Sequence, residues 1–206
     1  MSTTRTTRNA EATKERILDA ALAEFSAYGI AGARVDRIAR TAKCNKNLIY
    51  IYFEDKEALF NTILCKHISR IHEEQPFTPE DLPTYAAKIF DWVLANPDLM
   101  RLLAWSALEQ SPAAKAERLA SCDKKIAALA EAQKACHLGT AFPPYFLLIA
   151  VMSMATAWSV ASPFAPPLDP NAADRTAAMR KNLIEAVHLL AGLDKAPRTQ
   201  NKSKSG

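Results

Sequence analysis

Positive charge recurs at every third residue between Arg34 and Lys46, in the stretch RVDRIARTAKCNK. Asp36 is the one opposing charge in this stretch. The apolar residues between the charges have the spacing of a helix that buries one face, namely Val35, Ile38, Ala39 and Ala42. Arginine and lysine donate hydrogen bonds to phosphate oxygens and to guanine, so a helix that is basic on its outer side suits a nucleic acid.

A short break at Cys44 and Asn45 separates this helix from an apolar and aromatic run, LIYIYF, at residues 48–53. The spacing predicts one helix over residues 35–42 and a second over residues 46–52. Two short helices joined by a tight turn are typical of a helix-turn-helix, whose second helix enters the major groove. Duplex DNA is therefore the first partner to consider.

The remaining elements are also predicted to be helices. Thr13 is a candidate N-cap for a helix that ends before Gly29, and Asp55 is a candidate N-cap for a longer helix that links two parts of the chain. All twelve prolines lie after residue 75, and several stand at the start of a predicted helix behind a capping residue. No strand pattern is convincing, so we expect an all-α fold of about nine helices. The later helices are expected at 79–95, 97–110, 112–137, 144–161 and 171–191.

Composition limits the class of protein. The chain has 206 residues, 49% of them hydrophobic, which is enough for a sizeable core, and a net charge of +4. Four cysteines without C-x-x-C spacing favour reduced thiols in a cytoplasmic protein. The uncharged run at 144–161 contains polar and small residues, so we expect a buried helix or a subunit interface rather than a membrane span.

Residues 13–64 resemble the DNA-binding domain of TetR/AcrR-type transcriptional regulators. The matching segments are TKERILDAALAEF, VDRIARTA and KNLIYIYFEDKEALF, together with Gly29. The segment PDLMRLLAWSALE is similar to one in the second domain of that family. The resemblance implies a cytoplasmic homodimer that binds a palindromic DNA operator, and a small-molecule effector that alters the affinity for DNA, most often in a repressor. Between a polar arm (1–10) and a basic tail (195–206), both predicted from composition to be disordered, we expect a DNA-binding domain (11–72) and an effector-binding and dimerisation domain (73–194).

The N-terminal residues of the second short helix are the candidates for reading bases. Lys46 can donate to guanine, and Asn47 can pair with adenine through two hydrogen bonds. Leu48 has no polar group, so a thymine methyl is the partner that it could recognise.

Phosphate contacts are assigned from the resemblance. The family pattern maps them onto Tyr50 and Lys56, and Tyr52 is a further candidate. Arg34 stands where the family has a capping hydroxyl, and it could reach a phosphate instead. Arg37 is expected to face solvent or to form an internal ion pair.

The dimer interface is expected on the last two long helices, over residues 145–161 and 175–191. The alternative is that both pack only within one subunit. An apolar pocket for an uncharged or amphipathic effector is expected among the large side chains of the second domain, and the helix that Asp55 caps would transmit its occupancy. These side chains are Phe90, Trp92, Met100, Leu103, Trp105, Phe142, Tyr145, Phe146, Met152 and Trp158.

Two other classes of function stay open on the sequence alone. A helical interaction protein without an effector is one. An enzyme is the other, although the chain has no metalloprotease, nucleophile-elbow or phosphate-loop motif. We assign no catalytic residue, metal site or cofactor.

Overall fold

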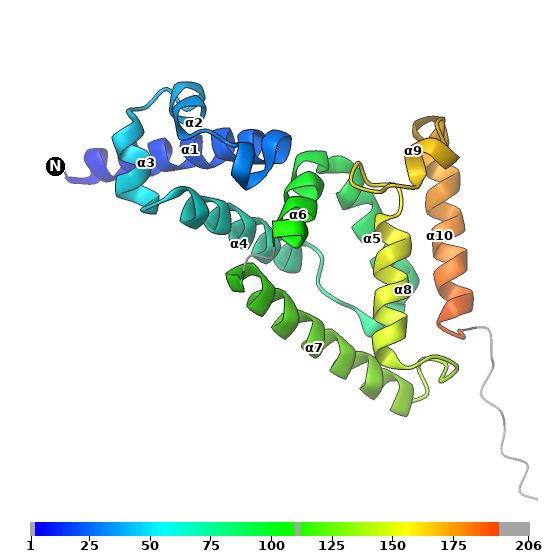
Figure 1. Ribbon diagram of the computed structural model, residues 1–206. Coiled ribbons are helices and arrows are strands. Elements are labelled where there is room, and N and C mark those ends of the chain that lie inside the picture. Colours follow the sequence, from blue (N-terminus) through cyan, green and yellow to red (C-terminus); the bar gives the residue numbers. More distant parts are fainter. Residues whose placement is uncertain (1–2, 110–111, 194–206) are drawn as a thin grey trace, which may run out of the picture. The chain divides into compact units, whose positions relative to one another are not determined.

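The computed structural model describes residues 3–109 and 112–193 (Figure 1). These residues form ten α-helices and two short 3-10 helices, and no strand occurs among them, which confirms the all-α prediction. The helices are α1 (Thr3–Gly32), α2 (Val35–Thr41), α3 (Lys46–Phe53), α4 (Lys56–Glu74), η1 (Pro79–Asp81), α5 (Leu82–Ala95), α6 (Pro97–Glu109), α7 (Pro112–Lys134), α8 (Pro144–Thr156), α9 (Ala165–Leu168), η2 (Ala172–Arg175) and α10 (Thr176–Leu190).

The chain forms two compact units, and the division differs from a single boundary near residue 73. The first unit comprises residues 1–76, 94–119 and 159–161, and the second comprises the rest. The first unit therefore includes α6, which the sequence placed with the second domain. α6 packs against α1 and α4, and the Trp105 indole N–H donates to the Ser26 carbonyl of α1 at 3.3 Å.

The core of the first unit follows the helical spacing of the sequence. Phe25 of α1 meets Phe60 of α4 edge to face, with ring centroids 5.2 Å apart, and both side chains are fully buried. Ile38 of α2 and Ile49 of α3 complete this core, which fixes the two short helices against α1 and α4. Buried apolar contact of this kind supplies most of the stability of short helices.

The N-terminal helix starts earlier than the sequence indicated. α1 begins at Thr3, although we expected irregular structure through residue 10 and a helix start at Thr13. Thr13 is inside the helix, and its hydroxyl donates to the Asn9 carbonyl at 2.9 Å, so its expected role as the N-cap is wrong. A threonine hydroxyl can return to a carbonyl one turn back as readily as it can cap. Gly29 does take a positive φ, 65°, as expected for the glycine that interrupts this helix.

In the second unit, α8 packs against α10, and α5 provides a continuous buried face that includes Tyr85, Ile89 and Phe90. Arg180 of α10 forms an ion pair with Asp91 of α5 at 2.9 Å. Helices begin at Pro97, Pro112 and Pro144 as expected, whereas Pro79 opens only the 3-10 helix η1 and α5 begins at Leu82. Thr78 makes no side-chain cap.

Other boundaries also differ from the prediction, since α7 ends at Lys134, α8 at Thr156, and α10 begins at Thr176. The predicted basic tail at 195–206 is outside the described residues. No helix within residues 3–109 and 112–193 is long and apolar enough to cross a membrane.

Candidate nucleic-acid interface

The turn between α2 and α3 is held by backbone hydrogen bonds and one side-chain cap. Asn45 is the N-cap of α3, and its side-chain oxygen accepts the Asn47 N–H at 2.9 Å. Lys43 takes a positive φ of 52°, and the Cys44 N–H donates to the Ala39 carbonyl at 3.0 Å. Cys44 is half-buried, and burial raises the pKa of its thiol, which agrees with a small packed side chain.

α3 divides into a buried side and an outer side. Ile49 and Phe53 are buried, whereas Asn47, Tyr50 and Ile51 are exposed. Two of the residues expected to contact DNA, Asn47 and Tyr50, therefore lie on the surface that a duplex could reach. Ile51 did not figure in the sequence-based prediction; the buried Ile49 and Phe53, two residues away on either side, were the signal that could have found it.

The other two residues of the apolar run that were predicted to contact DNA are less exposed to solvent. Leu48 and Tyr52 are both half-buried, and the ring of Tyr52 meets that of Phe53 edge to face at 6.2 Å. Their outer atoms are accessible, while part of each side chain packs on the protein. Both assignments to DNA remain predictions.

Lys46 has a partner within the protein. Its Nζ lies 3.0 Å from a carboxylate oxygen of Asp36 on α2. The hydrogen bond and the charge of Asp36 raise the pKa of Lys46, so its positive charge is secure. The pair links α2 to the first residue of α3, and a contact from Lys46 to a base would have to share or replace Asp36.

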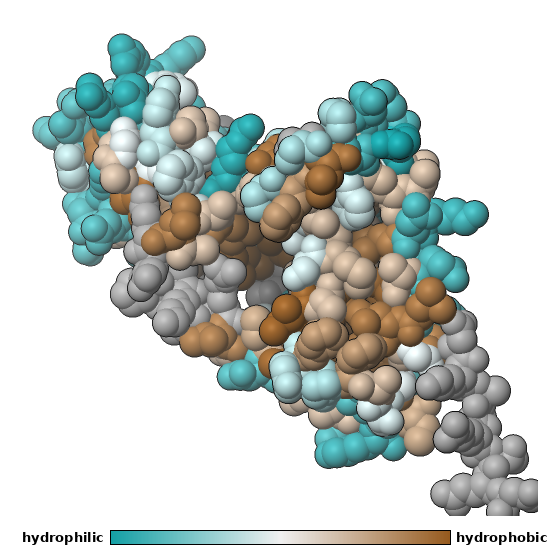
Figure 2. Space-filling view, turned by 45° about the vertical axis from the view of Figure 1, so that its right-hand side comes forward, coloured by the Kyte–Doolittle hydropathy of each residue, from teal (hydrophilic) through white to brown (hydrophobic). Residues whose placement is uncertain are grey.

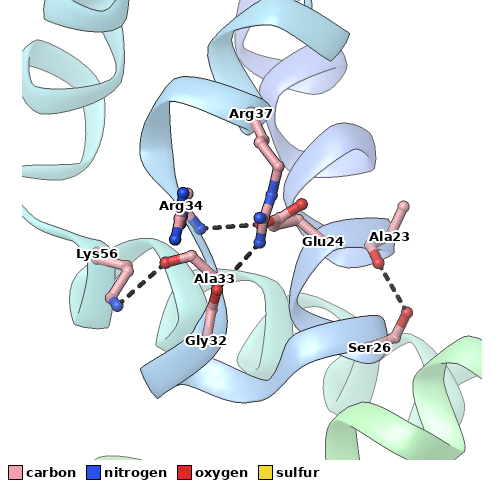
Figure 3. Close-up of polar contacts among 8 residues, drawn as sticks. All are labelled: Ala23, Glu24, Ser26, Gly32, Ala33, Arg34, Arg37 and Lys56. Carbon is pink, nitrogen blue, oxygen red and sulfur yellow. Dashed lines mark hydrogen bonds and ion pairs between the residues drawn. The ribbon is translucent and has the colours of Figure 1, made fainter.

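A buried carboxylate organises the start of α2 (Figure 3). Glu24 of α1 is only 9% exposed, and one of its oxygens accepts both the Arg37 Nε–H at 2.7 Å and the backbone N–H of Arg34 at 2.8 Å. Burial by itself would raise the pKa of Glu24, but the hydrogen bonds and charges of Arg37 and Arg34 hold it below its usual value. The Arg37 guanidinium also donates to the Gly32 carbonyl and lies over the ring of Tyr28.

This arrangement decides between the two roles expected of Arg37 and shows the surroundings of Arg34. Arg37 forms an internal ion pair, as one of its two expected roles required. Arg34 is the N-cap of α2 without a side-chain cap, and Glu24 supplies the acceptor instead, so the Arg34 side chain stays exposed. The sequence missed Glu24 because the ion pair joins residues on different helices.

Lys56 lies close to this junction at the start of α4. Its Nζ donates to the Ala33 carbonyl at 3.3 Å, and the side chain is half-buried (Figure 3). Asp55 caps α4 by accepting the Ala58 N–H at 2.7 Å, which confirms its predicted role. Lys56 thus contacts the carbonyl of Ala33, which directly precedes Arg34 in the chain, and Arg34 is exposed.

The residues expected to line an effector pocket belong to both units. Met100, Leu103 and Trp105 lie on α6 in the first unit, and the others lie in the second. Within the second unit, Phe90 and Trp158 meet edge to face, with ring centroids 6.1 Å apart. Whether these side chains line one pocket stays a prediction.

Three of the expected pocket residues are exposed at or just before the start of α8. Phe142 and Phe146 stack with ring centroids 5.1 Å apart, and Tyr145 and Ile149 extend the apolar surface along the helix. Phe146 is 44% exposed, Tyr145 57% and Ile149 63%. Figure 2 shows hydrophobic residues gathered on the face of the second unit that the view presents. We name Phe142, Tyr145, Phe146 and Ile149 the α8 patch.

No metal centre is evident in the part of the chain that the structure describes, because no three His, Cys, Asp or Glu side chains gather there in a suitable cluster.

Short helices joined by a capped turn, with a polar outer side on the second, define a helix-turn-helix regulator of transcription. Residues 17–63 match the family model "Bacterial regulatory proteins, tetR family", and residues 81–188 match "Tetracyclin repressor-like, C-terminal domain". The chain belongs to the TetR family of transcriptional regulators, which confirms the resemblance of residues 13–64 to that family.

Individual relatives agree with this assignment. The chain is 40% identical over 159 residues to the HTH-type transcriptional repressor SCO4008 of Streptomyces coelicolor, covering 76% of this chain and 82% of that protein. It is 32% identical over 111 residues to the repressor NicS of Pseudomonas putida, covering 50% and 52% of the two chains. The crystal structure of the transcriptional regulator SCO4942 of Streptomyces coelicolor superposes with a TM-score of 0.77 at 36% identity, covering 86% of this chain and 97% of that one.

Proposed function

We propose that this protein is a transcriptional repressor that binds a palindromic operator as a homodimer and is released by a small, largely apolar effector. The observation that carries the proposal is the outer side of α3. Asn47 and Tyr50 are exposed there, while Ile49 and Phe53 hold the opposite side in the core. A short helix that packs against the core on one side and exposes polar groups on the other can enter a major groove without reorganising. Repression is inferred from relatives that are named as repressors.

Contacts to DNA divide into two kinds in this proposal. Asn47 reads a base edge, and Lys46 does so if it leaves Asp36. Tyr50, Lys56 and Arg34 contact phosphates and fix the register of the protein on the duplex, without reading sequence.

The α8 patch supports the homodimer. A second copy of the chain would cover Phe146 and Ile149 with its own α8 patch, because a two-fold interface uses the same surface of both subunits. α10 packs against α8 and exposes Leu189, so it can add to the interface. A dimer places two copies of α3 about 34–36 Å apart, one helical turn of DNA.

Release by an effector needs an element that responds to the ligand and also contacts the DNA-binding helices. α6 meets the second requirement, because it packs against α1 and α4 and is tied to α1 through Trp105 and Ser26. α6 also carries Met100 and Leu103, two of the predicted pocket residues. A ligand that binds one position of α6 more tightly than another shifts the protein toward that position. The affinity for DNA can then change by no more than the ratio of the two ligand affinities. α4, the helix that Asp55 caps, would pass the change on.

An unbiased selection from random duplex oligonucleotides tests the proposal, followed by binding measurements with a metabolite library. We expect enrichment of one palindromic site, a complex of two subunits per site, and at least one apolar compound that weakens it. Absence of any enriched sequence would contradict the DNA-binding role. Enrichment without a response to any compound would favour a helical DNA-binding protein that has no effector.

A further inference from the structure

Ile51 is the large apolar side chain that α3 exposes most, at 72% of its possible area. It lies two residues from Ile49 and two from Phe53, both buried. Because successive residues of an α-helix turn by about 100°, Ile51 points roughly 160° away from each of them. No residue of α3 faces more directly away from the core.

The surroundings of Ile51 do not form an apolar surface. Asn47 lies one turn before it and Glu54 follows α3, and both side chains are exposed and polar. Tyr50, beside it, is 42% exposed and ends in a hydroxyl. A surface that docks another protein is usually a contiguous apolar patch, and Ile51 with the half-buried Leu48 one turn before it is too small to be one.

Duplex DNA offers one apolar group of matching size in the major groove, the C5-methyl of thymine. Asn47 and Ile51 are four residues apart, so they lie on the same side of α3 and would face neighbouring base edges. Burial of a methyl group against Ile51 would remove apolar surface from water on both partners, and no other base edge in the groove offers that gain.

We propose that Ile51 is a specificity-determining residue that recognises a thymine methyl in the operator. The inference rests on the proposed DNA-binding function and deepens it. It also changes the assignment made from the sequence, which gave this role to Leu48. Leu48 is half-buried, and it is turned only about 100° from the buried Ile49, whereas Ile51 is turned roughly 160°.

Removal of the methyl group alone tests the proposal. The operator obtained by selection is resynthesised with deoxyuridine in place of each thymine in turn, which deletes one methyl and leaves the base pairing intact. Binding of each duplex is measured for the full-length wild-type protein, for Ile51→Ala and for the matched control Leu48→Ala. Ile51 is outside the core, so thermal unfolding of Ile51→Ala should match that of the wild type.

We expect one thymine in each half-site whose replacement by deoxyuridine weakens wild-type binding about fourfold, the effect of one buried methyl group. The penalty should disappear in Ile51→Ala and persist in Leu48→Ala. If the penalty persists in Ile51→Ala, or if no deoxyuridine weakens wild-type binding to the selected site, the inference is overturned while the DNA-binding function stands. Failure of the selection itself would remove the proposed function and this inference together.

Discussion

α3 and α8 are both short helices that expose large apolar side chains, but they do so in different ways. α3 exposes Ile51 between polar neighbours, whereas α8 exposes Tyr145, Phe146 and Ile149 in succession. A single apolar group can be matched by a single methyl on a base edge. A contiguous row needs a surface of similar extent, and in the proposed homodimer a second copy of α8 would provide it.

The contacts that hold α3 and α8 in place also differ. α3 is anchored by the buried Ile49 and Phe53, and it also has polar contacts at its start, the Asn45 cap and the pair between Lys46 and Asp36. α8 has no side-chain cap at Pro143 and is held by the apolar packing of Leu147, Leu148 and Val151. The start of α3 therefore depends partly on hydrogen bonding, whereas the α8 patch should respond to changes in apolar area.

The largest effect is expected from charge in the α8 patch. The double variant Phe146→Glu and Ile149→Glu should be monomeric, because two copies would bring four carboxylates into an apolar interface. Its affinity for the operator should fall roughly 10³-fold or more, toward non-specific binding, since one α3 reads only half of a site. Sedimentation equilibrium and DNA titration measure both effects.

Leu108→Glu is the matched control, because Leu108 is 73% exposed and lies on α6 instead of α8. It should remain dimeric. A double variant that stays dimeric would show that the α8 patch does not form the interface.

The next effect concerns the polar support of the helix-turn-helix. Glu24→Gln should lower the free energy of unfolding by about 1–3 kcal/mol at pH 7, because Arg37 loses its charged acceptor. The pKa of Glu24 is lowered in the folded protein, so its contribution is complete above the unfolded pKa of about 4.3 and is lost as pH falls through the folded pKa. Urea unfolding from pH 7 to pH 3 should show the gap between wild type and variant closing at the acid end.

Glu73→Gln serves as the control for this series, since Glu73 is exposed on α4. A gap between wild type and Glu24→Gln that is independent of pH would mean that the glutamine costs stability through its shape and not through the lost charge.

A smaller effect distinguishes residues that contact phosphates from residues that contact bases. Lys56→Ala should weaken binding to every duplex alike and lower the slope of log affinity against log salt by about one, because one phosphate contact is lost. Asn47→Ala is the comparison, and it should relax the preference at one base position by roughly 1–3 kcal/mol with little change in slope. Fluorescence anisotropy at several salt concentrations distinguishes the two. Unchanged non-specific binding in Lys56→Ala would contradict the phosphate assignment.

The smallest effect is expected at the residue that ends α3. Glu54 has φ 64° and ψ −61°, and the Asp55 N–H donates to the Phe53 carbonyl at 2.6 Å, which makes a tight γ-turn with positive φ. Glu54→Gly should stabilise the protein by about 1 kcal/mol, because relief of roughly 1–3 kcal/mol of strain exceeds the entropy cost of glycine. Thermal unfolding measures the gain.

Glu57→Gly, in the first turn of α4, should instead destabilise by about 0.5–1 kcal/mol, because it places glycine in an unstrained helix. A loss of stability in Glu54→Gly would show that the turn carries no relievable strain.

The short helices were predictable because their signals are local. Residues 35–42 and 46–52 were expected to be helical, and α2 and α3 occupy 35–41 and 46–53. The spacing of apolar residues and the Asp55 cap are both encoded within a few positions. The start of α1 was missed because Thr13 satisfies the pattern of an N-cap and equally that of a helical threonine bonded one turn back.

The amino-acid sequence by itself determined the class of fold, the location of the helix-turn-helix and the family, because all three depend on helical periodicity and on contiguous motifs. Only the tertiary structure decided that Glu24 orders Arg34 and Arg37 and that α6 packs with α1. The reason is physical. Each of these outcomes depends on which surfaces of separate helices meet, and spacing within one helix leaves that choice open.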